Sequence, residues 1–187
     1  MQQPIIMTVD IGLYKSGFCL LDIEEGEPFE HGCIATGDTR GMISDLFAIA
    51  ISRNATTIVF ELSHHRDFHA TKLRGLIEDI QTKYSINVAF CTAPEWRHSL
   101  HFHSRYKERE EYKELALDYV KNYYPEHYKN TMSDDEAEAI CMGAAYLKGL
   151  YSLTTKKEKR NEAAKKKKNF HKHRELEDYE EYQHLYR

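Results

Sequence analysis

The sequence predicts an α/β fold built on a mixed five-stranded sheet with helices on both faces. Three apolar, β-rich runs separated by short loops lie near the N-terminus, and this spacing is typical of an antiparallel meander. After residue 37 the apolar residues follow helical and strand spacing in alternation, and the last two segments both have helical spacing. A meander followed by alternating helices and strands gives a mixed sheet covered by helices.

The five strands follow from apolar or β-branched runs bounded by turn residues. Gly12 and Gly17 frame the first turn, and Pro94 follows the last run. We expect the strands at Ile5–Val9, Phe18–Ile23, Gly32–Ala35 with its flanks, Thr56–Phe60 and Ile86–Phe90.

Apolar residues at helical spacing predict helices at Met42–Arg53, Ala70–Lys83, Glu108–Tyr124 and Ala137–Leu150. Ser133 is a good N-cap for the last helix, and Glu136 three residues later completes a predicted capping box. The helix at Ala70–Lys83 carries an apolar stripe made of Leu73, Leu76, Ile77 and Ile80. That stripe fits either the core or an interface with a second copy of the chain.

Composition excludes several classes of protein. With 41% hydrophobic and 30% charged residues, the 187-residue chain is typical of one globular domain with or without a tail. It has no apolar run of the roughly 18 residues that a membrane helix needs, and its start does not resemble a signal peptide. The four cysteines are far apart, so we expect reduced thiols, no membrane partner and a cytoplasmic protein.

The net charge of −4 conceals a strong asymmetry along the chain. Residues 156–174 contain ten Lys or Arg and two Glu, whereas residues 175–187 contain five Asp or Glu and one Arg. We therefore expect a folded domain over residues 1–154 and a charged tail over 155–187, with a basic part and an acidic tip. The basic part fits either a solubility tail or contact with the phosphates of a polyanion.

Acidic residues stand at the ends of three separate predicted elements. Asp10 ends the first strand, Glu61 ends the fourth, and the cluster Asp134–Glu138 opens the last helix. In that helix Asp135 and Glu138 are three residues apart and Asp134 and Glu138 four apart, so either pair projects from one face. Carboxylates that converge repel one another, and a hard cation such as Mg²⁺ relieves this repulsion. Two such ions can support hydrolysis of a phosphodiester.

Short motifs in this order resemble the RuvC family of Holliday junction resolvases, which are metal-dependent endonucleases with the ribonuclease-H-like fold. Residues 6–12, IMTVDIG, resemble the family's opening strand with its catalytic Asp, and Val59-Phe60-Glu61 is similar to the strand with the second acid. Residues 135–140, DEAEAI, are similar to the closing D-x-x-D-A pattern, although Glu138 stands where the family usually has Asp or His. The remaining resemblance is carried by residues 32–37, 72–75, 94–97 and 113–116.

The resemblance covers about Ile5 to Leu147 and makes residues 1–154 a RuvC-like nuclease domain. It implies a homodimer that nicks four-way junctions or other branched DNA in recombination and repair, with Mg²⁺ or a substituting Mn²⁺. The implied catalytic and metal-binding residues are Asp10, Glu61, Asp135 and Glu138, with Asp134 as an alternate. The candidates for DNA contact, including an aromatic wedge among His64, His65 and Phe68, are Lys15, His64, His65, Arg66, Phe68, Lys72, Arg74, Arg97, Lys107 and Lys113.

Two alternatives remain open at this level. The chain fits a non-catalytic nucleic-acid-binding module of the same fold, although it carries the full acid set. It also fits a zinc-binding protein, because histidines cluster in two places. These histidines are His64, His65, His69, His98, His101 and His103. Stoichiometric zinc in the purified protein would favour the second alternative.

Truncation after Thr155 tests the role of the basic tail. Each phosphate that the protein neutralises on duplex DNA contributes about −0.9 to the slope of log K against log salt. If the tail contacts three or four phosphates, the truncated protein should show a slope flatter by roughly three units, with junction selectivity unchanged. A salt titration of junction binding measures this slope, and identical slopes would leave only the solubility role.

Overall fold

The computed structural model describes residues 4–62, 68–102 and 108–148, and within them five strands form one mixed sheet. The strands are β1 (Ile5–Ile11), β2 (Lys15–Asp22), β3 (Glu27–Ala35), β4 (Ala55–Glu61) and β5 (Asn87–Cys91). Their order across the sheet is β3-β2-β1-β4-β5. The first three strands pair antiparallel, whereas β4 runs parallel to both β1 and β5.

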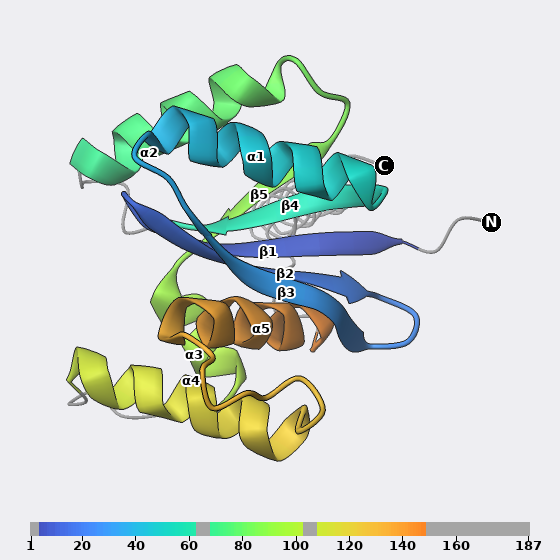
Figure 1. Ribbon diagram of the computed structural model, residues 1–187, viewed down its shortest axis with the longest axis vertical. Helices are drawn as coiled ribbons and strands as arrows, with labels where there is room; N and C mark the ends of the chain where they lie inside the picture. The colour runs from blue at the N-terminus through green and yellow to red at the C-terminus, as the bar shows by residue number, and fades with distance from the viewer. Residues whose placement is uncertain (1–3, 63–67, 103–107, 149–187) are drawn as a thin grey trace, which may run out of the picture. The chain divides into compact units, whose positions relative to one another are not determined.

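The helices lie on both faces of this sheet, which confirms the predicted fold class (Figure 1). On one face lie α1 (Thr39–Ser52) and α2 (Phe68–Gln81). On the other face lie α3 (Ala93–Ser99), α4 (Arg109–Tyr123) and α5 (Asp134–Leu147), with α5 against the sheet and α4 packed outside it.

The alternation of side chains along β1 and β4 separates the core from the acidic residues. Met7 and Val9 of β1, with Ile58 and Phe60 of β4, belong to the buried cluster that also contains the apolar residues of α1 and α2. Successive side chains of a strand point to opposite faces. Asp10 and Glu61, one position further along, therefore point to the face that α5 covers.

Helix α5 approaches β1 and β2 unusually closely because two glycines and a threonine allow it. A Cβ atom on Gly17 would lie 2.0 Å from the backbone oxygen of Asp135, and one on Gly143 would lie 2.3 Å from the Leu21 side chain. The buried Thr8 hydroxyl donates a hydrogen bond of 2.7 Å to the Ala139 carbonyl oxygen. These contacts fix the position of the helix that carries three of the predicted acidic residues.

The strands and four of the helices lie within a few residues of their predicted positions. Helix α3 is not predicted, because Pro94 indicates the end of a strand, whereas it lies in the first turn of a helix capped by Thr92 and Glu95. Proline fits that position since its missing N–H has no partner there in any case.

The predicted capping box at α5 is half right. The Ser133 hydroxyl accepts a hydrogen bond from the Glu136 backbone, as expected. The Glu136 side chain instead contacts His31 of β3, with 2.6 Å between Oε1 and Nδ1. The partner on the neighbouring strand therefore replaces the local backbone partner.

The apolar stripe of α2 faces the sheet. Ile77 and Ile80 are buried in the core cluster, and Leu73 and Leu76 are partly buried against it. This face of α2 is therefore occupied within one copy of the chain. No helix among residues 4–62, 68–102 and 108–148 is long and apolar enough to cross a membrane. No disulfide joins the cysteines, all of which lie within the described residues, and Cys19 and Cys141 are buried.

The substitution Gly17→Ala should lower the free energy of unfolding by about 3 kcal/mol, because its Cβ meets backbone that cannot move without shifting α5. Gly37→Ala is the matched control, since its added Cβ has no atom within 4 Å. Urea denaturation of both variants measures the effect. Equal stability of the two variants would contradict the close approach of β2 and α5.

Candidate active site

The site begins with two carboxylates at the ends of neighbouring parallel strands. Asp10 of β1 and Glu61 of β4 are register partners, and both lie at the carboxyl ends of their strands. Open α/β sheets place ligands at this edge, where strands end and loops begin. The pairing therefore brings together two acidic residues that lie 51 positions apart in the sequence.

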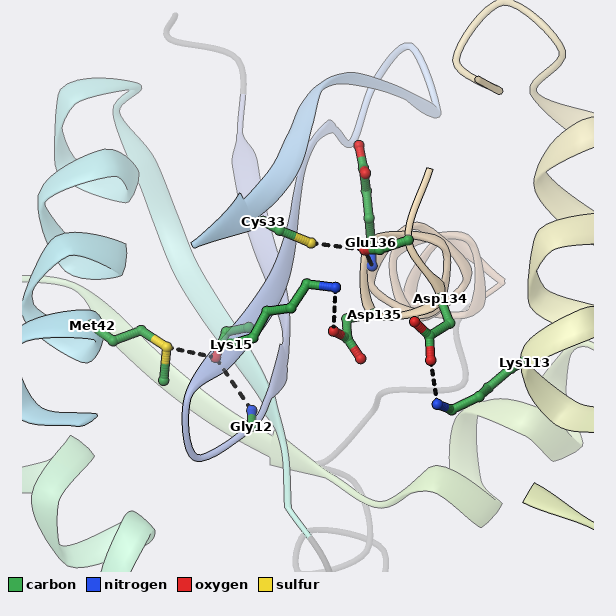
Figure 2. A network of polar contacts seen from close by, with 10 residues as sticks. Gly12, Lys15, Cys33, Met42, Lys113, Asp134, Asp135 and Glu136 are labelled. Carbon is green, nitrogen blue, oxygen red and sulfur yellow. Dashed lines mark hydrogen bonds and ion pairs between the residues drawn. The ribbon is translucent and has the colours of Figure 1, made fainter. Parts of the chain in front are cut away.

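Helix α5 adds three more carboxylates on the side that faces the sheet edge. Asp134 and Asp135 lie in its first turn, and Glu138 lies one turn further on with only 7% of its surface exposed. Figure 2 shows Asp134 and Asp135 on a different side of the helix end from Glu136. Glu136, which was not predicted as a site residue, is turned toward β3 and His31.

The pKa of Asp10 identifies the point at which these groups converge. Removal from solvent raises the pKa of Asp10 well above its ordinary value, and the nearby charges of Glu61, Glu138, Asp135 and Asp134 raise it further. The structure thus brings the charges of Glu61, Asp135, Glu138 and the alternate Asp134 to act on the partly buried carboxyl group of Asp10.

Glu61 is held in place by the neighbouring helix α3. The Trp96 indole N–H donates a hydrogen bond of 2.5 Å to Glu61 Oε2. Removal from solvent raises the pKa of Glu61, although the bond from Trp96 acts in the opposite direction. Trp96, which is fully buried, therefore fixes one oxygen of the carboxylate and leaves the other for a ligand.

Three predicted DNA-binding cations contact the carboxylates of α5. Lys15 lies 2.9 Å from Asp135, and the Arg97 guanidinium donates a 2.7 Å hydrogen bond to Glu138. Lys113 pairs with Asp134, and Figure 2 shows this pair beside that of Lys15. Burial acts to raise the pKa of Asp134, but the hydrogen bond and charge of Lys113 keep that pKa below its ordinary value.

The donor set suits Mg²⁺ or Mn²⁺ in kind, because every candidate ligand is a carboxylate oxygen. The raised pKa of Asp10 gives a second indication, since excess negative charge is concentrated at this point. In the described part of the chain, however, no three His, Cys, Asp or Glu side chains lie in an arrangement that could hold a metal ion. The present geometry is one in which lysine and arginine neutralise the acids.

The other predicted DNA contacts lie in different surroundings. Phe68, at the start of α2, is 77% exposed, and Lys72 is exposed one turn later. The Arg74 guanidinium lies over the Phe90 ring at 3.9 Å. His64, His65, Arg66 and Lys107 lie outside the described residues.

Only some of the histidines considered for a zinc site lie within the described residues. His64, His65 and His103 lie outside the described residues, whereas His69, His98 and His101 lie within them. These three belong to no group that could hold a metal ion among the described positions.

Sequence reasoning missed two contributors to the site. Trp96 is the only tryptophan of the chain and follows Pro94, but its role depends on α3, which was not predicted. The His31 contact with Glu136 joins residues 105 positions apart. Their spacing in the sequence gives no signal for that contact.

Comparison with solved structures identifies the fold. RuvC from Thermus thermophilus superposes with a TM-score of 0.59 at 11% identity, covering 81% of this chain and 96% of that one. The Fowlpox virus Holliday junction resolvase gives a TM-score of 0.59 at 13% identity, covering 78% and 99%. The fold is ribonuclease-H-like. No family model and no curated protein matches the sequence.

The same resemblance extends to two structures solved with DNA. One is Thermus thermophilus RuvC with a Holliday junction substrate, at a TM-score of 0.58 and 11% identity over 81% of this chain and 96% of that one. The other is the Fowlpox virus resolvase with its substrate Holliday junction, at 0.58 and 16% over 79% and 99%.

Asp10→Asn should stabilise the metal-free protein at pH 7. Because the pKa of Asp10 is higher in the folded than in the unfolded chain, the folded protein binds more protons above pH 3.8, the ordinary value. Stability therefore falls as pH rises through the folded pKa, and the neutral amide avoids that loss. The urea midpoint should rise at pH 7 and remain unchanged below pH 3.8.

Asp45→Asn, at an exposed position of α1, is the control for this measurement and should leave the midpoint unchanged at both pH values. A lower midpoint for Asp10→Asn at pH 7 would mean that the carboxylate is stabilised by its surroundings and would contradict the crowding of charges.

Proposed function

We propose that this chain is a metal-dependent endonuclease that resolves four-way junctions and other branched DNA by paired hydrolysis of phosphodiesters. The observation that carries the proposal is the convergence of Glu61, Asp135 and Glu138 on the partly buried Asp10. These acids come from two parallel strands and one helix of a ribonuclease-H-like fold. The two DNA-bound neighbours described above add support, because each is a complex with Holliday junction DNA.

In this proposal Asp10, Glu61, Asp135 and Glu138 hold Mg²⁺, with Mn²⁺ able to substitute and Asp134 as the alternate to Asp135. When bound, the metal supplies an activated water and stabilises the leaving oxygen of the phosphodiester. Trp96 contributes by fixing the orientation of Glu61 through its indole N–H. The shell around the ligands thus determines their geometry, as in other metal sites.

The basic side chains around the acids are suited to phosphates. Lys15 and Lys113 border the first turn of α5, and both remain partly exposed. A phosphate of the scissile strand can therefore reach them without a change in the backbone. At the start of α2, Phe68 offers an exposed ring for stacking on a base and Lys72 an exposed ammonium for a phosphate.

Paired nicking requires two active sites related by a dyad, which a homodimer supplies. We include the homodimer in the proposal without assigning its interface. The apolar stripe of α2, one sequence-based candidate, already covers the sheet of its own chain.

The variants Asp10→Asn, Glu61→Gln and Asp135→Asn should each lower the nicking rate of a synthetic four-way junction by at least about 1,000-fold. Junction affinity measured without divalent metal should change little, because these acids act in the chemical step. Rates at saturating enzyme with Mg²⁺ or Mn²⁺, compared with flap and linear duplex substrates, measure the effect. A cruciform plasmid reports paired nicks as linear product and single nicks as open circles.

Two further variants fix the register of the last metal ligands. Glu138→Asp should retain activity because it restores the residue typical of RuvC-like enzymes. Loss of nicking in Asp134→Asn but not in Asp135→Asn would move the ligand by one position. Nicking at the wild-type rate by any two of the three principal variants would contradict the assignment. A protein that binds junctions but never nicks them would instead be a non-catalytic binding module.

A further inference from the structure

Arg97 is held tightly at the centre of the acidic site. Its guanidinium donates to Glu138 at 2.7 Å and lies over the rings of Tyr112 at 4.4 Å and Trp96 at 5.1 Å. The pair is enclosed, since the side chains of Arg97 and Glu138 are only 21% and 9% exposed. Consecutive residues of the short helix α3 thus hold two of the proposed metal ligands, because Trp96 holds Glu61.

The enclosed pair is nevertheless incompletely satisfied. Arg97 Nε is buried and has no hydrogen-bond partner in the described structure. An enclosed ion pair is stable when its remaining N–H groups are also bonded, and a buried donor without an acceptor is costly. The guanidinium therefore has a donor to offer to another acceptor, and an anionic oxygen is the acceptor that it prefers.

We propose that Arg97 and the divalent metal exchange on Glu138. In the structure the guanidinium pairs with this carboxylate. A divalent metal held by Asp10 and Glu61 would take Glu138 as a ligand in place of Arg97, and the guanidinium would then be available to a phosphate of the DNA. This inference rests on the proposed function and assigns the regulation of the same site.

The arrangement of the acids supports the exchange. The charge of Glu138 acts on Asp10 together with the charges of Glu61, Asp135 and Asp134, so Glu138 belongs to the group of acids that a cation at this point would neutralise. Because a guanidinium and a metal ion both carry positive charge, they compete for the same oxygen atoms.

Arg97 is a stronger competitor than the two lysines. The pairs Lys15–Asp135 and Lys113–Asp134 have side-chain exposures between 25% and 41%, so water screens them. Exposed pairs of this kind contribute little free energy. The Arg97–Glu138 pair is enclosed by two aromatic rings, where charges interact more strongly. In this proposal the separation of Arg97 from Glu138 therefore controls the access of metal to the site.

The exchange makes metal and DNA bind cooperatively. A phosphate that draws Arg97 away from Glu138 frees a ligand for the metal, and a metal on Glu138 frees Arg97 for a phosphate. Such coupling is reciprocal by thermodynamic linkage. Each ligand therefore raises the affinity of the protein for the other.

The test is a calorimetric titration of metal-free, full-length protein with Mn²⁺ in the absence of DNA. Arg97→Met removes the competing charge and keeps an apolar stem against Trp96 and Tyr112. It should bind Mn²⁺ more tightly than wild type, on the order of tenfold. Arg97→Lys, which keeps the charge, should stay near wild type. Arg40→Met is the matched control, because it breaks an exposed ion pair with Asp79 that joins α1 and α2 on the face of the sheet opposite α5.

If Arg97→Met binds Mn²⁺ no more tightly than wild type, the exchange is overturned. It is also overturned if Lys113→Met gains as much Mn²⁺ affinity as Arg97→Met, because the gain would then come from the loss of any nearby positive charge. If the Met variant does not fold by thermal melting, Arg97→Gln is titrated in its place. If the titration contradicts the exchange while the wild-type protein still nicks junctions, only the exchange is overturned and the proposed function is not. Absence of Mn²⁺ binding by all variants and wild type would overturn both.

Discussion

The close approach of α5 to the sheet is the constraint on which the rest of the site depends. Gly17 and Gly143 remove the side chains that would hold the helix away, and the Thr8 hydroxyl fixes its distance from β1. Thr8 and Asp10 are two residues apart on one strand, so both face the helix. The contact that secures α5 therefore also sets the distance between Asp10 and the acids of the helix.

That approach has an electrostatic cost, because it places several carboxylates around a partly buried carboxyl group. The protein offsets this cost with cations from three different places: Lys15 on β2, Arg97 on α3 and Lys113 on α4. None of these pairs is local in sequence. The acids thus pair with the same basic groups that the proposed function assigns to DNA phosphates.

Sequence patterns predicted most of the fold because the strands and long helices have clear periods. The acids were predictable for the same reason, since Asp10 and Glu61 each end an apolar run and Ser133 marks the start of α5. The partners of these acids were not predictable. Arg97 lies 41 residues from Glu138, and α3, which carries it, is a seven-residue helix that begins with Ala93-Pro94. Such a short segment has too few turns to show a helical period.

The acidic charge of the folded domain is compatible with binding to DNA once the location of the acids is considered. Much of the repulsion is concentrated around Asp10, where the proposed function places a divalent cation that would reverse the local charge. The basic side chains at this point are paired with the carboxylates. In the proposed function the metal takes over these carboxylates and leaves the basic side chains to the phosphates, so the net charge of the domain does not by itself argue against DNA as the substrate.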